Sequence, residues 1–390
     1  MAAPRVAIVG AGLAGSLCAL RCSQLGMRCV IFDASPRAAG GRLGGGFHPD
    51  SGAAFVRATS PSFSRVLATL QEMGVVAEWR GRFGVLGTRG GGFLPLQALH
   101  TSQALPSNLS ALRGSEDFCN FASGGGVSAY VGTPSNASIC PAICRASGAE
   151  LRLGARISAA RCGEDGWELE SIVDPSHPSH PSHPSPPSDP SQPTDRTRFD
   201  ALVLASHDAS FAARVVQSLP SEPSHASHLS HLAQALQSQR DEQTTPVFSL
   251  SAIFPAASLS STLPFDAVSV PGSSHLSFLC RHASKPKRTD AAAGELWSAV
   301  STPSLAKQVL EDAGRVEGDS RRLVEAAAAA ALVQELRYLC RPFYGGDLAA
   351  VPQPLEAHAK RWGAGFAAKT LGLQEDSIGL EPWRLVVGNS

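Results

Sequence analysis

The segment VAIVGAGLAG, residues 6–15, constrains the fold more strongly than any other part of the chain. Its first four residues form an unbroken apolar run, which is typical of a parallel strand buried on both faces. Gly10, Gly12 and Gly15 follow with the spacing GxGxxG. In this pattern the first glycine allows a tight turn, the second lets a pyrophosphate approach the backbone, and the third lets the next helix pack closely on the strand. The segment SLCALRCSQLG predicts that helix, and its N-terminus would face the phosphates.

A second predicted strand, RCVIFD, ends in Asp33, eighteen residues after Gly15. A carboxylate in this place suits the acceptance of hydrogen bonds from ribose hydroxyls. The strand, the glycine loop, the helix and the acid together predict a dinucleotide site. A glycine turn that holds no nucleotide is the weaker interpretation.

The segment AGGRLGG places Gly40, Gly41 and Arg42 soon after Asp33. An arginine reached through two glycines can approach a pyrophosphate and pair with it. A plain NAD dehydrogenase has no evident use for such an element, so it favours FAD over NAD. The alternative is a glycine-rich surface loop with a solvated arginine.

The composition of the 390 residues excludes several classes of protein. The formal net charge is zero, so we expect no nucleic-acid partner. No apolar run is long enough to span a bilayer, so we expect no membrane partner. The first predicted strand begins at residue 5 or 6, which leaves no room for a targeting peptide. The nine cysteines are scattered without a CxxC pair, so we expect reduced thiols in a cytoplasmic protein.

The pattern along the chain indicates a nucleotide-binding start over residues 1–60 and a second domain from 246 to about 365. Residues 61–80 predict an amphipathic helix. Residues 175–195, rich in Pro, Ser and His, predict a disordered insert between strands. The histidines of this insert and of SHASHLSHLAQAL, the second His-bearing stretch, lie in biased composition, so we expect no metal site.

These motifs resemble the FAD-dependent amine-oxidase superfamily, and within it the renalase-like branch. VGAGLAGSLCAL is similar to the opening of that branch, GGRL to its second motif, and PDSGAAFV to the element that follows. Further segments keep the order of the branch, among them YVGTPSNASI, FDALVLAS, WSAVSTPSLAKQVLED and HAKRWGAG. The first two motifs are specific to the superfamily, whereas the later ones gain their weight from their order.

The resemblance implies an α/β fold, with a Rossmann-like FAD/NAD(P)-binding domain and a second α+β substrate domain containing a mostly antiparallel sheet. The first domain would comprise residues 1–60, 120–245 and 366–390. The second would comprise residues 61–119 and 246–365. FAD would be bound non-covalently, and the flavin would carry the hydride chemistry, so no side-chain base is implied.

The resemblance also assigns roles to single residues. The cofactor-binding residues would be Gly10, Gly12, Leu13, Ala14 and Gly15 at the phosphates, Asp33 at the ribose, Gly40, Gly41 and Arg42 at the pyrophosphate, Ala54 and Phe55 near the flavin ring, and Ile157, whose backbone would meet adenine. Asp50 and Gly52 belong to the same element as Ala54. Trp362 would lie on the substrate side.

The chain departs from the pattern at several positions. Ala54 replaces a glutamine and so cannot donate hydrogen bonds to a flavin. Asn136 stands where many relatives have methionine, and His207 stands where a proline is usual. Asn389 stands where an aspartate is expected, and the helix that would follow it is absent, so we expect part of the flavin wall to be missing.

The leading hypothesis is an oxidoreductase that passes hydride from a small reduced substrate, dihydronicotinamide-like or an amine, to FAD, with O2 as the expected acceptor. Renalase, which gives the branch its name, oxidises dihydro-isomers of NAD(P)H. One alternative is a truncated or degenerate flavin-fold protein that binds nucleotide without turnover. Another is a small-amine or polyamine oxidase, which would call for an aromatic or acidic cage around a cation. A plain NAD dehydrogenase is a third.

Overall fold

A computed structural model of the chain describes residues 2–45, 48, 50–88, 92–99, 117–122, 128–173, 194–219, 223–242, 244–290, 294–313, 320–367, 377–380 and 385–388. The chain divides into two compact units. Unit 1 comprises Met1–Gly44, Ala137–Thr244 and Ala367–Ser390, and unit 2 comprises Gly45–Asn136 and Thr245–Phe366.

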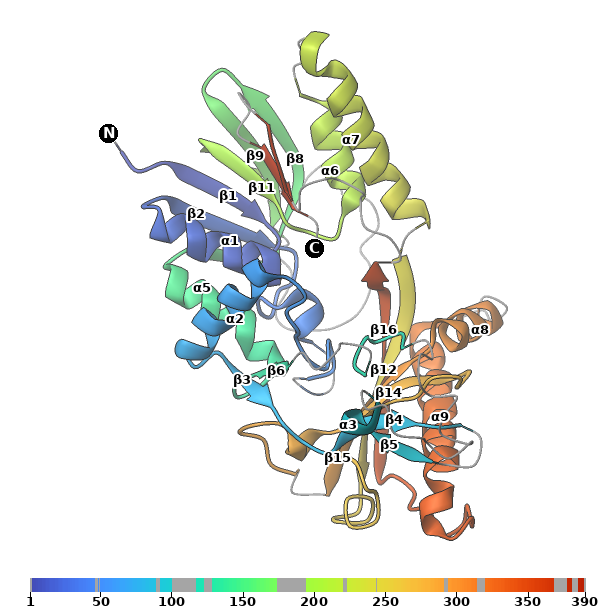
Figure 1. The fold of residues 1–390 in the computed structure, drawn as a ribbon. Helices are drawn as coiled ribbons and strands as arrows, with labels where there is room; N and C mark the ends of the chain where they lie inside the picture. The colour runs from blue at the N-terminus through green and yellow to red at the C-terminus, as the bar shows by residue number, and fades with distance from the viewer. Residues whose placement is uncertain are drawn as a thin grey trace. The chain divides into compact units, whose positions relative to one another are not determined.

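Unit 1 is built on a mainly parallel sheet with the strand order β17-β18-β11-β1-β2-β7 among the described residues. Its strands are β1 (Arg5–Val9), β2 (Arg28–Asp33), β7 (Glu150–Leu153), β11 (Ala201–Leu204), β17 (Ser377–Leu380) and β18 (Leu385–Gly388). β1 pairs in parallel with both β2 and β11, and the edge pair β17–β18 is antiparallel. The predicted strand RCVIFD is therefore confirmed as β2, which lies beside β1, and β11 lies on the other side of β1 (Figure 1).

The helices of unit 1 cover its sheet. They are α1 (Leu13–Gln24), α5 (Ile139–Ser147), α6 (Ala209–Gln217) and α7 (Pro223–Glu242), with the short turns η1 (Gly41–Leu43) and η2 (Asn136–Ser138). A buried apolar core joins α6 and α7 to β1, β2 and β11. The antiparallel strands β8 (Ala155–Gly163), β9 (Gly166–Val173) and β10 (Thr194–Phe199) add a second small sheet to the same core.

Unit 2 contains a mostly antiparallel sheet with the order β16-β12-β15-β14-β13-β4-β5 among the described residues. Its strands are β4 (Phe83–Leu86), β5 (Phe93–Pro95), β12 (Thr244–Phe254), β13 (Ala267–Ser269), β14 (Leu276–Arg281), β15 (Glu295–Ser301) and β16 (Glu356–Ala367). Around it lie α2 (Pro61–Glu72), α3 (Leu96–Leu99), α8 (Pro303–Ala313), α9 (Ser320–Cys340), η3 (His282–Ser284), η4 (Arg341–Tyr344) and the pair β3 (Val76–Trp79) and β6 (Ala129–Gly132). This mixture confirms the expected α/β fold with an antiparallel sheet.

Three expectations about boundaries need correction. The helix predicted over 61–80 ends at Glu72, because Gly74 adopts a φ of +70° and the β-branched residues after it form β3. Residues 45–60 belong to unit 2 rather than to the nucleotide-binding unit, and so do 120–136. The disordered insert predicted over 175–195 ends earlier, since β10 begins at Thr194, and its residues 175–193 lie outside the described residues.

Candidate functional site

The first glycine loop has the geometry that its spacing predicts. Gly10 adopts a φ of +108°, and a Cβ there would lie 2.7 Å from the carbonyl oxygen of Ala205 in the chain after β11. A Cβ on Gly15 would lie 1.9 Å from the carbonyl oxygen of Gly10, so only glycine lets α1 pack this closely on β1. Gly12 precedes α1 and has no atom within 4 Å of a hypothetical Cβ. The space above Gly12 is therefore open to a ligand at the N-terminus of the helix.

Asp33 holds this loop in place from the end of β2. Its Oδ2 accepts a hydrogen bond of 2.7 Å from the backbone N–H of Ala11, and its Oδ1 accepts one of 2.8 Å from Ser35. A carboxylate has about four acceptor sites, so two remain for ribose hydroxyls. Asp33 is thus placed both to shape the loop and to receive a nucleotide.

The second glycine loop lies directly against the first. The N–H of Gly40 donates to the carbonyl oxygen of Ala11 over 3.0 Å. Gly41 adopts a φ of +51°, and a Cβ there would lie 3.2 Å from the Cα of Gly12. The structure therefore brings together two loops that are separated by some 25 residues in the sequence.

Arg42 follows in η1 and is half-buried. Burial lowers the pKa of its guanidinium, and no acidic side chain of the described residues pairs with it. A partly desolvated cation without a protein anion is unfavourable unless a ligand supplies the negative charge. Its five donors in a planar fork suit a phosphate.

Helix α5 supports both loops from behind. The thiol of Cys140 contacts the carbonyl oxygen of Gly40 at 3.8 Å. The thiol of Cys144 lies 3.4 Å from the hydroxyl of Ser16, which in turn reaches the carbonyl oxygen of Ala11 at 3.5 Å. These thiols are buried, and burial raises the pKa of Cys140 to about 12. They act as small packing groups rather than as reactive thiols.

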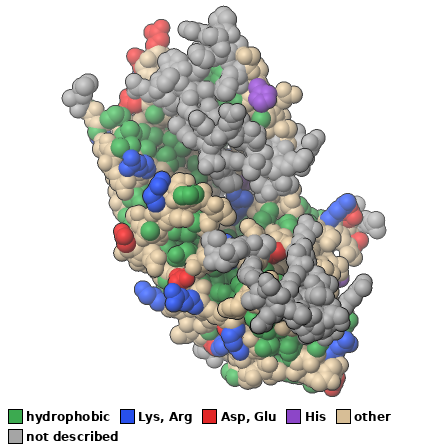
Figure 2. All heavy atoms as spheres, viewed as in Figure 1, with side chains coloured by type: hydrophobic (Ala, Val, Ile, Leu, Met, Phe, Trp, Pro, Cys, Tyr) green, Lys and Arg blue, Asp and Glu red, His purple; other side chains and the backbone are tan. Residues whose placement is uncertain are grey.

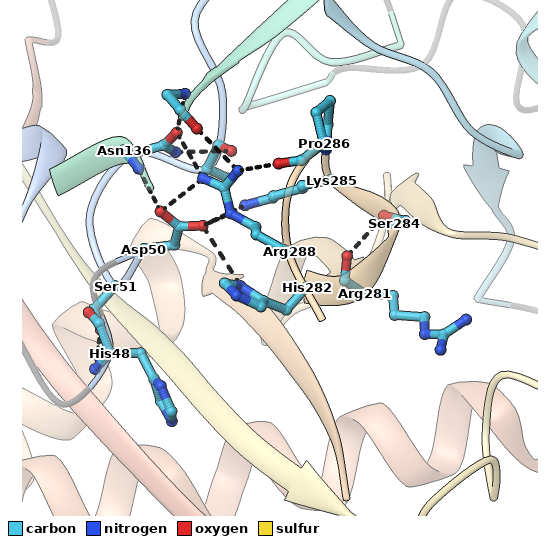
Figure 3. Close-up of polar contacts among 12 residues, drawn as sticks. His48, Asp50, Ser51, Asn136, Arg281, His282, Ser284, Lys285, Pro286 and Arg288 are labelled. Carbon is cyan, nitrogen blue, oxygen red and sulfur yellow. Dashed lines mark hydrogen bonds and ion pairs between the residues drawn. The ribbon is translucent and has the colours of Figure 1, made fainter. Parts of the chain in front are cut away.

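A separate cluster of charged side chains lies in unit 2 around Asp50 (Figure 3). The guanidinium of Arg288 donates to the Asp50 carboxylate from Nε over 2.6 Å and from Nη2 over 3.1 Å. The backbone N–H of Asn136 donates to the same carboxylate over 2.6 Å. The side chains of Asp50 and Arg288 are 1% and 2% exposed. Together with Lys285 and His282 they form what we call the Asp50 cluster.

The cations of the Asp50 cluster outnumber its carboxylate. Nζ of Lys285, whose side chain is 0% exposed, lies 3.8 Å from Asp50 Oδ2 and has no hydrogen-bond partner in the described part of the chain. Burial alone would raise the pKa of Asp50, but Lys285, Arg288 and the Asn136 N–H hold it below its ordinary value. His282 lies 3.5 Å from Asp50, yet burial, with Lys285 and Arg288, lowers its pKa to about 4. His282 is therefore neutral at pH 7, and the cluster carries a net positive charge.

Comparison with known proteins assigns the chain to a family. The sequence profile of the family described as FAD dependent oxidoreductase (DAO) matches residues 5–256, well over half of the chain. The chain belongs to this family. No curated protein matches it.

Several solved structures share the fold of this chain. An oxidoreductase from Methanosarcina mazei is 12% identical with a TM-score of 0.61, and the match covers 98% of this chain and 94% of that chain. A candidate protoporphyrinogen oxidase from Exiguobacterium sp. 255-15 is 14% identical with a TM-score of 0.56, with 95% and 89% covered. Putrescine oxidase bound to putrescine is 12% identical with a TM-score of 0.53, with 100% and 88% covered. At these identities the likeness shows the fold alone.

The residues of unit 1 fit the FAD that the family uses. The open space above Gly12 offers room for a pyrophosphate, and Arg42, which has no acidic partner in the described ranges, offers charge, while Asp33 keeps free acceptors. Ile157 lies in β8, where the pairing with β9 shifts between Ile157 and Ala159. Such an irregularity leaves backbone groups unpaired in the ladder, which suits a backbone contact with a ligand.

Leu13 and Ala14 begin α1 in unit 1, whereas Ala54, Phe55 and Trp362 lie in unit 2. The ring of Phe55 packs against Phe121 and Phe278 with centroids 5.1 and 5.7 Å apart, so it belongs to a local aromatic core. The carbonyl oxygen of Ala54 accepts a hydrogen bond from Asn136 Nδ2 over 3.2 Å. Trp362 donates from Nε1 to the hydroxyl of Ser249 over 2.9 Å. Unit 2 therefore holds these three residues among its own contacts.

Sequence reasoning missed Lys285 and Arg288 altogether. They lie in the run RHASKPKR, which reads as a solvated basic turn because nothing in it reveals a buried carboxylate elsewhere in the chain. It treated Asn136 only as a departure from a pattern. In the structure Asn136 is fully buried, and its side chain accepts from the N–H of Gly132 and donates to Ala53 and Ala54.

The other features that could point to a function, namely His207, metal ligands, membrane-spanning helices and surface charge, add little to this site. His207 is exposed in the turn before α6. Within the described ranges no group of three His, Cys, Asp or Glu residues is placed to hold a metal ion. None of the helices that can be described has the length and apolar character needed to cross a membrane. On the face shown in Figure 2, basic and acidic side chains are interspersed.

Proposed function

We propose that the protein binds FAD non-covalently and passes hydride to it from a small reduced substrate, with O2 as the final acceptor. The observation that carries this proposal is Arg42, a half-buried guanidinium with no acidic partner among the described residues, next to two glycine loops in contact. The partner is a small molecule. The unpaired state of all nine cysteines supports a cytoplasmic location.

The chain's own residues would bind and orient the cofactor, while the bound flavin supplies the electron-accepting ring. Backbone N–H groups at the start of α1 and the fork of Arg42 would hold the pyrophosphate from two sides. Asp33 would accept hydrogen bonds from the ribose while it keeps Ala11, and so the loop, in position. Unit 2 would supply the substrate side, with Trp362 as its aromatic group.

For the substrate, the renalase-like pattern favours a dihydronicotinamide. The Asp50 cluster supports that choice, because two buried cations face a single carboxylate in the unit expected to hold the substrate. A net positive charge in a poorly solvated region disfavours a cationic amine. The putrescine oxidase among the similar folds keeps a small-amine or polyamine oxidase as the alternative.

One residue favours a second candidate, a protein that binds the nucleotide without turnover. Ala54 offers only a methyl group where relatives carry a glutamine, so a hydrogen bond to the flavin is lost. Binding of the ADP half depends on unit 1 and would survive this change. Catalysis depends on the flavin ring, so its rate would fall.

A visible spectrum of the purified full-length chain, before and after reconstitution with FAD, tests the proposal. We expect flavin absorption that bleaches with a dihydronicotinamide under anaerobic conditions and returns with O2. Heat denaturation should release all the FAD into the filtrate, since the link is non-covalent. Bleaching by putrescine but not by dihydronicotinamides would make the protein an amine oxidase. Bound FAD that no reductant bleaches would favour the binding protein, and a chain that takes up no FAD would refute the proposal.

A further inference from the structure

The antiparallel sheet of unit 2 packs on helices with one of its two faces. Residues of β12 and β15 share an apolar core with residues of α8 and α9. Ala357 and Ala359 of the edge strand β16 pack against the same core. Successive side chains of a strand point to opposite faces of a sheet, so Lys360 and Trp362 of β16 lie on the other face.

This other face carries the residues that the resemblance assigns to the flavin ring and to the substrate. Phe55 packs against Phe278 of β14, which pairs opposite Val300 of β15, and Val300 in turn pairs opposite Ser249 of β12. Trp362 joins this row, because its Nε1 donates to the Ser249 hydroxyl over 2.9 Å. Phe55 and Trp362 therefore lie on the same side of the unit 2 sheet.

The indole ring of Trp362 is held by its edge. The Ser249 hydroxyl that accepts from Trp362 donates in turn to the carbonyl oxygen of Ser51 over 2.6 Å. Ser249 and Ser51 are both buried, whereas Trp362 is half-buried. Because the N–H of the ring is already engaged, a face is what the ring offers to any further partner.

The ammonium group of Lys360 lies over the face of that ring. Its Nζ is 3.9 Å from the ring centroid of Trp362, and a cation is attracted to an aromatic face within about 6 Å. The same Nζ donates to the carbonyl oxygen of Gly45 over 2.8 Å. Gly45 adopts a φ of +87°, and a Cβ there would lie 3.1 Å from Nζ, so glycine lets the chain approach the lysine this closely. The ammonium is thus held between a carbonyl group and the ring.

Aromatic faces are a common means by which proteins bind cationic amines. In this chain an ammonium group of the protein itself occupies the face of Trp362. We propose that Lys360 makes this face reject cationic substrates, so that the site selects an uncharged reduced ring over an amine. The inference deepens the proposed function and rests on it, because it takes Trp362 to lie on the substrate side.

Two physical effects of Lys360 act against a second cation. An incoming ammonium must displace Lys360 to gain the attraction of the ring. If it does not, two like charges about 4 Å apart repel each other, and the repulsion grows where water is scarce. The positive Asp50 cluster acts in the same direction, but a substitution of Lys360 leaves that cluster as it is. A difference between variants at this position therefore reports on Lys360.

Tetramethylammonium is a suitable probe, because it carries a positive charge and no hydrogen-bond donor. Its Kd for the full-length protein is measured by calorimetry at constant ionic strength, before and after reconstitution with FAD. In Lys360→Met, which keeps an apolar stem and removes the charge, the Kd should fall about 10-fold. tert-Butanol, an uncharged probe of similar shape, should show no such gain. Lys307→Met, which removes an exposed lysine on α8, is the control and should leave the Kd unchanged.

Three further variants separate the charge of Lys360 from its structural role, with the thermal unfolding midpoint as the check on folding. Lys360→Gln removes the charge but keeps an N–H donor for Gly45, and it should show the same gain. Lys360→Arg keeps a cation and should bind the probe as weakly as the unaltered protein. Trp362→Leu, added to Lys360→Met, should abolish the gain. No gain in Lys360→Met and Lys360→Gln, or a gain that survives Trp362→Leu, would overturn the proposal.

Anaerobic reduction of the flavin separates this inference from the proposed function. The rate of bleaching by putrescine, relative to that by a dihydronicotinamide, should rise about 10-fold in Lys360→Met. If neither compound bleaches FAD bound to the unaltered protein, the proposed function fails, and the tetramethylammonium titrations alone decide whether Lys360 keeps cations from Trp362. If the dihydronicotinamide bleaches the flavin but the ratio stays the same in Lys360→Met, the role given to Lys360 in substrate selection is wrong.

Discussion

Arg288 in unit 2 is buried and Arg42 in unit 1 is half-buried, and the surroundings of the two guanidinium groups differ. Arg288 donates hydrogen bonds to the Asp50 carboxylate, to the carbonyl oxygens of Gly132 and Pro286, and to the side chain of Asn136. Arg42 has no acidic partner among the described residues. A buried cation that is fully paired stabilises its own fold, whereas an unpaired one costs stability until a ligand arrives. The contrast separates a cluster whose arginine is paired within the protein from the site that we propose for a phosphate.

The largest effect on stability should come from removing Arg288 from the Asp50 cluster. Arg288→Met leaves the buried Asp50 carboxylate with Lys285 as the remaining cation of the Asp50 cluster and with the hydrogen bond from the Asn136 N–H, and such a change typically costs about 3–5 kcal/mol. We expect a lower thermal unfolding midpoint and a lower urea midpoint. Arg82→Met is the matched control, because Arg82 makes the same two-point contact with Asp266 but its side chain is 49% exposed. That control should cost about 1 kcal/mol or less, and equal losses in the two variants would contradict the argument.

The next effect is the pH dependence of the Asp50 cluster. His282 has a pKa of about 4 in the folded chain and an ordinary value near 6.5 when unfolded, so the unfolded chain binds more protons between these values. Stability should therefore fall as the pH drops from about 6.5 to 4, by up to roughly 3 kcal/mol. Urea unfolding at a series of pH values measures this slope.

His282→Gln should flatten that slope, because glutamine does not titrate. The control is His358→Gln, since His358 is exposed and paired with Glu356 on β16. The Asp50 carboxyl, whose pKa is lowered, adds a further loss only below its unfolded value near 3.9, outside this window. A slope that survives in His282→Gln would assign the pH dependence to another group.

A smaller effect is expected at the open site, and it should appear in binding rather than in folding. Arg42→Met removes charge-assisted hydrogen bonds to a phosphate, so the affinity for FAD should fall about 10- to 100-fold. The unfolding midpoint of the cofactor-free protein should not fall, because no acidic group of the described residues loses a partner. Titration of the apoprotein with FAD, followed by flavin fluorescence, measures the affinity. Arg37→Met, which removes an exposed arginine from the same segment, should bind FAD normally.

Unit 1 was largely predictable from the sequence because its parts are local. The glycine spacing predicts the tight turn at Gly10 and the close packing at Gly15, and the structure has both. The apolar runs also predict β1 and β2, since strands buried on both faces carry little else. The contact of Gly41 with Gly12 joins the second glycine motif, residues 40–42, to the first, and both motifs can be read from the sequence.

The Asp50 cluster was not predictable, because its members come from segments separated by more than 200 residues. A lysine and an arginine beside prolines are usually solvated, and periodicity says nothing about a carboxylate that folds onto them. The strand at 76–79 was missed for a related reason. Its apolar residues continue the helical pattern of α2, and only Gly74 marks the change.

The smallest expected effect on FAD affinity tests most directly whether the phosphates lie above Gly12. Gly12→Ala adds a methyl group where no atom lies within 4 Å, at a φ of −74° that alanine adopts freely. The cofactor-free protein should therefore unfold as before, whereas a pyrophosphate held against this backbone must move outward and weaken about one hydrogen bond. We expect a loss of FAD affinity of roughly 3- to 10-fold. Gly363→Ala, on β16 and equally uncrowded, is the control for the added methyl group. If Gly12→Ala binds FAD as tightly as Gly363→Ala does, the space above Gly12 is not where the phosphates lie, and Arg42 must meet them from another direction.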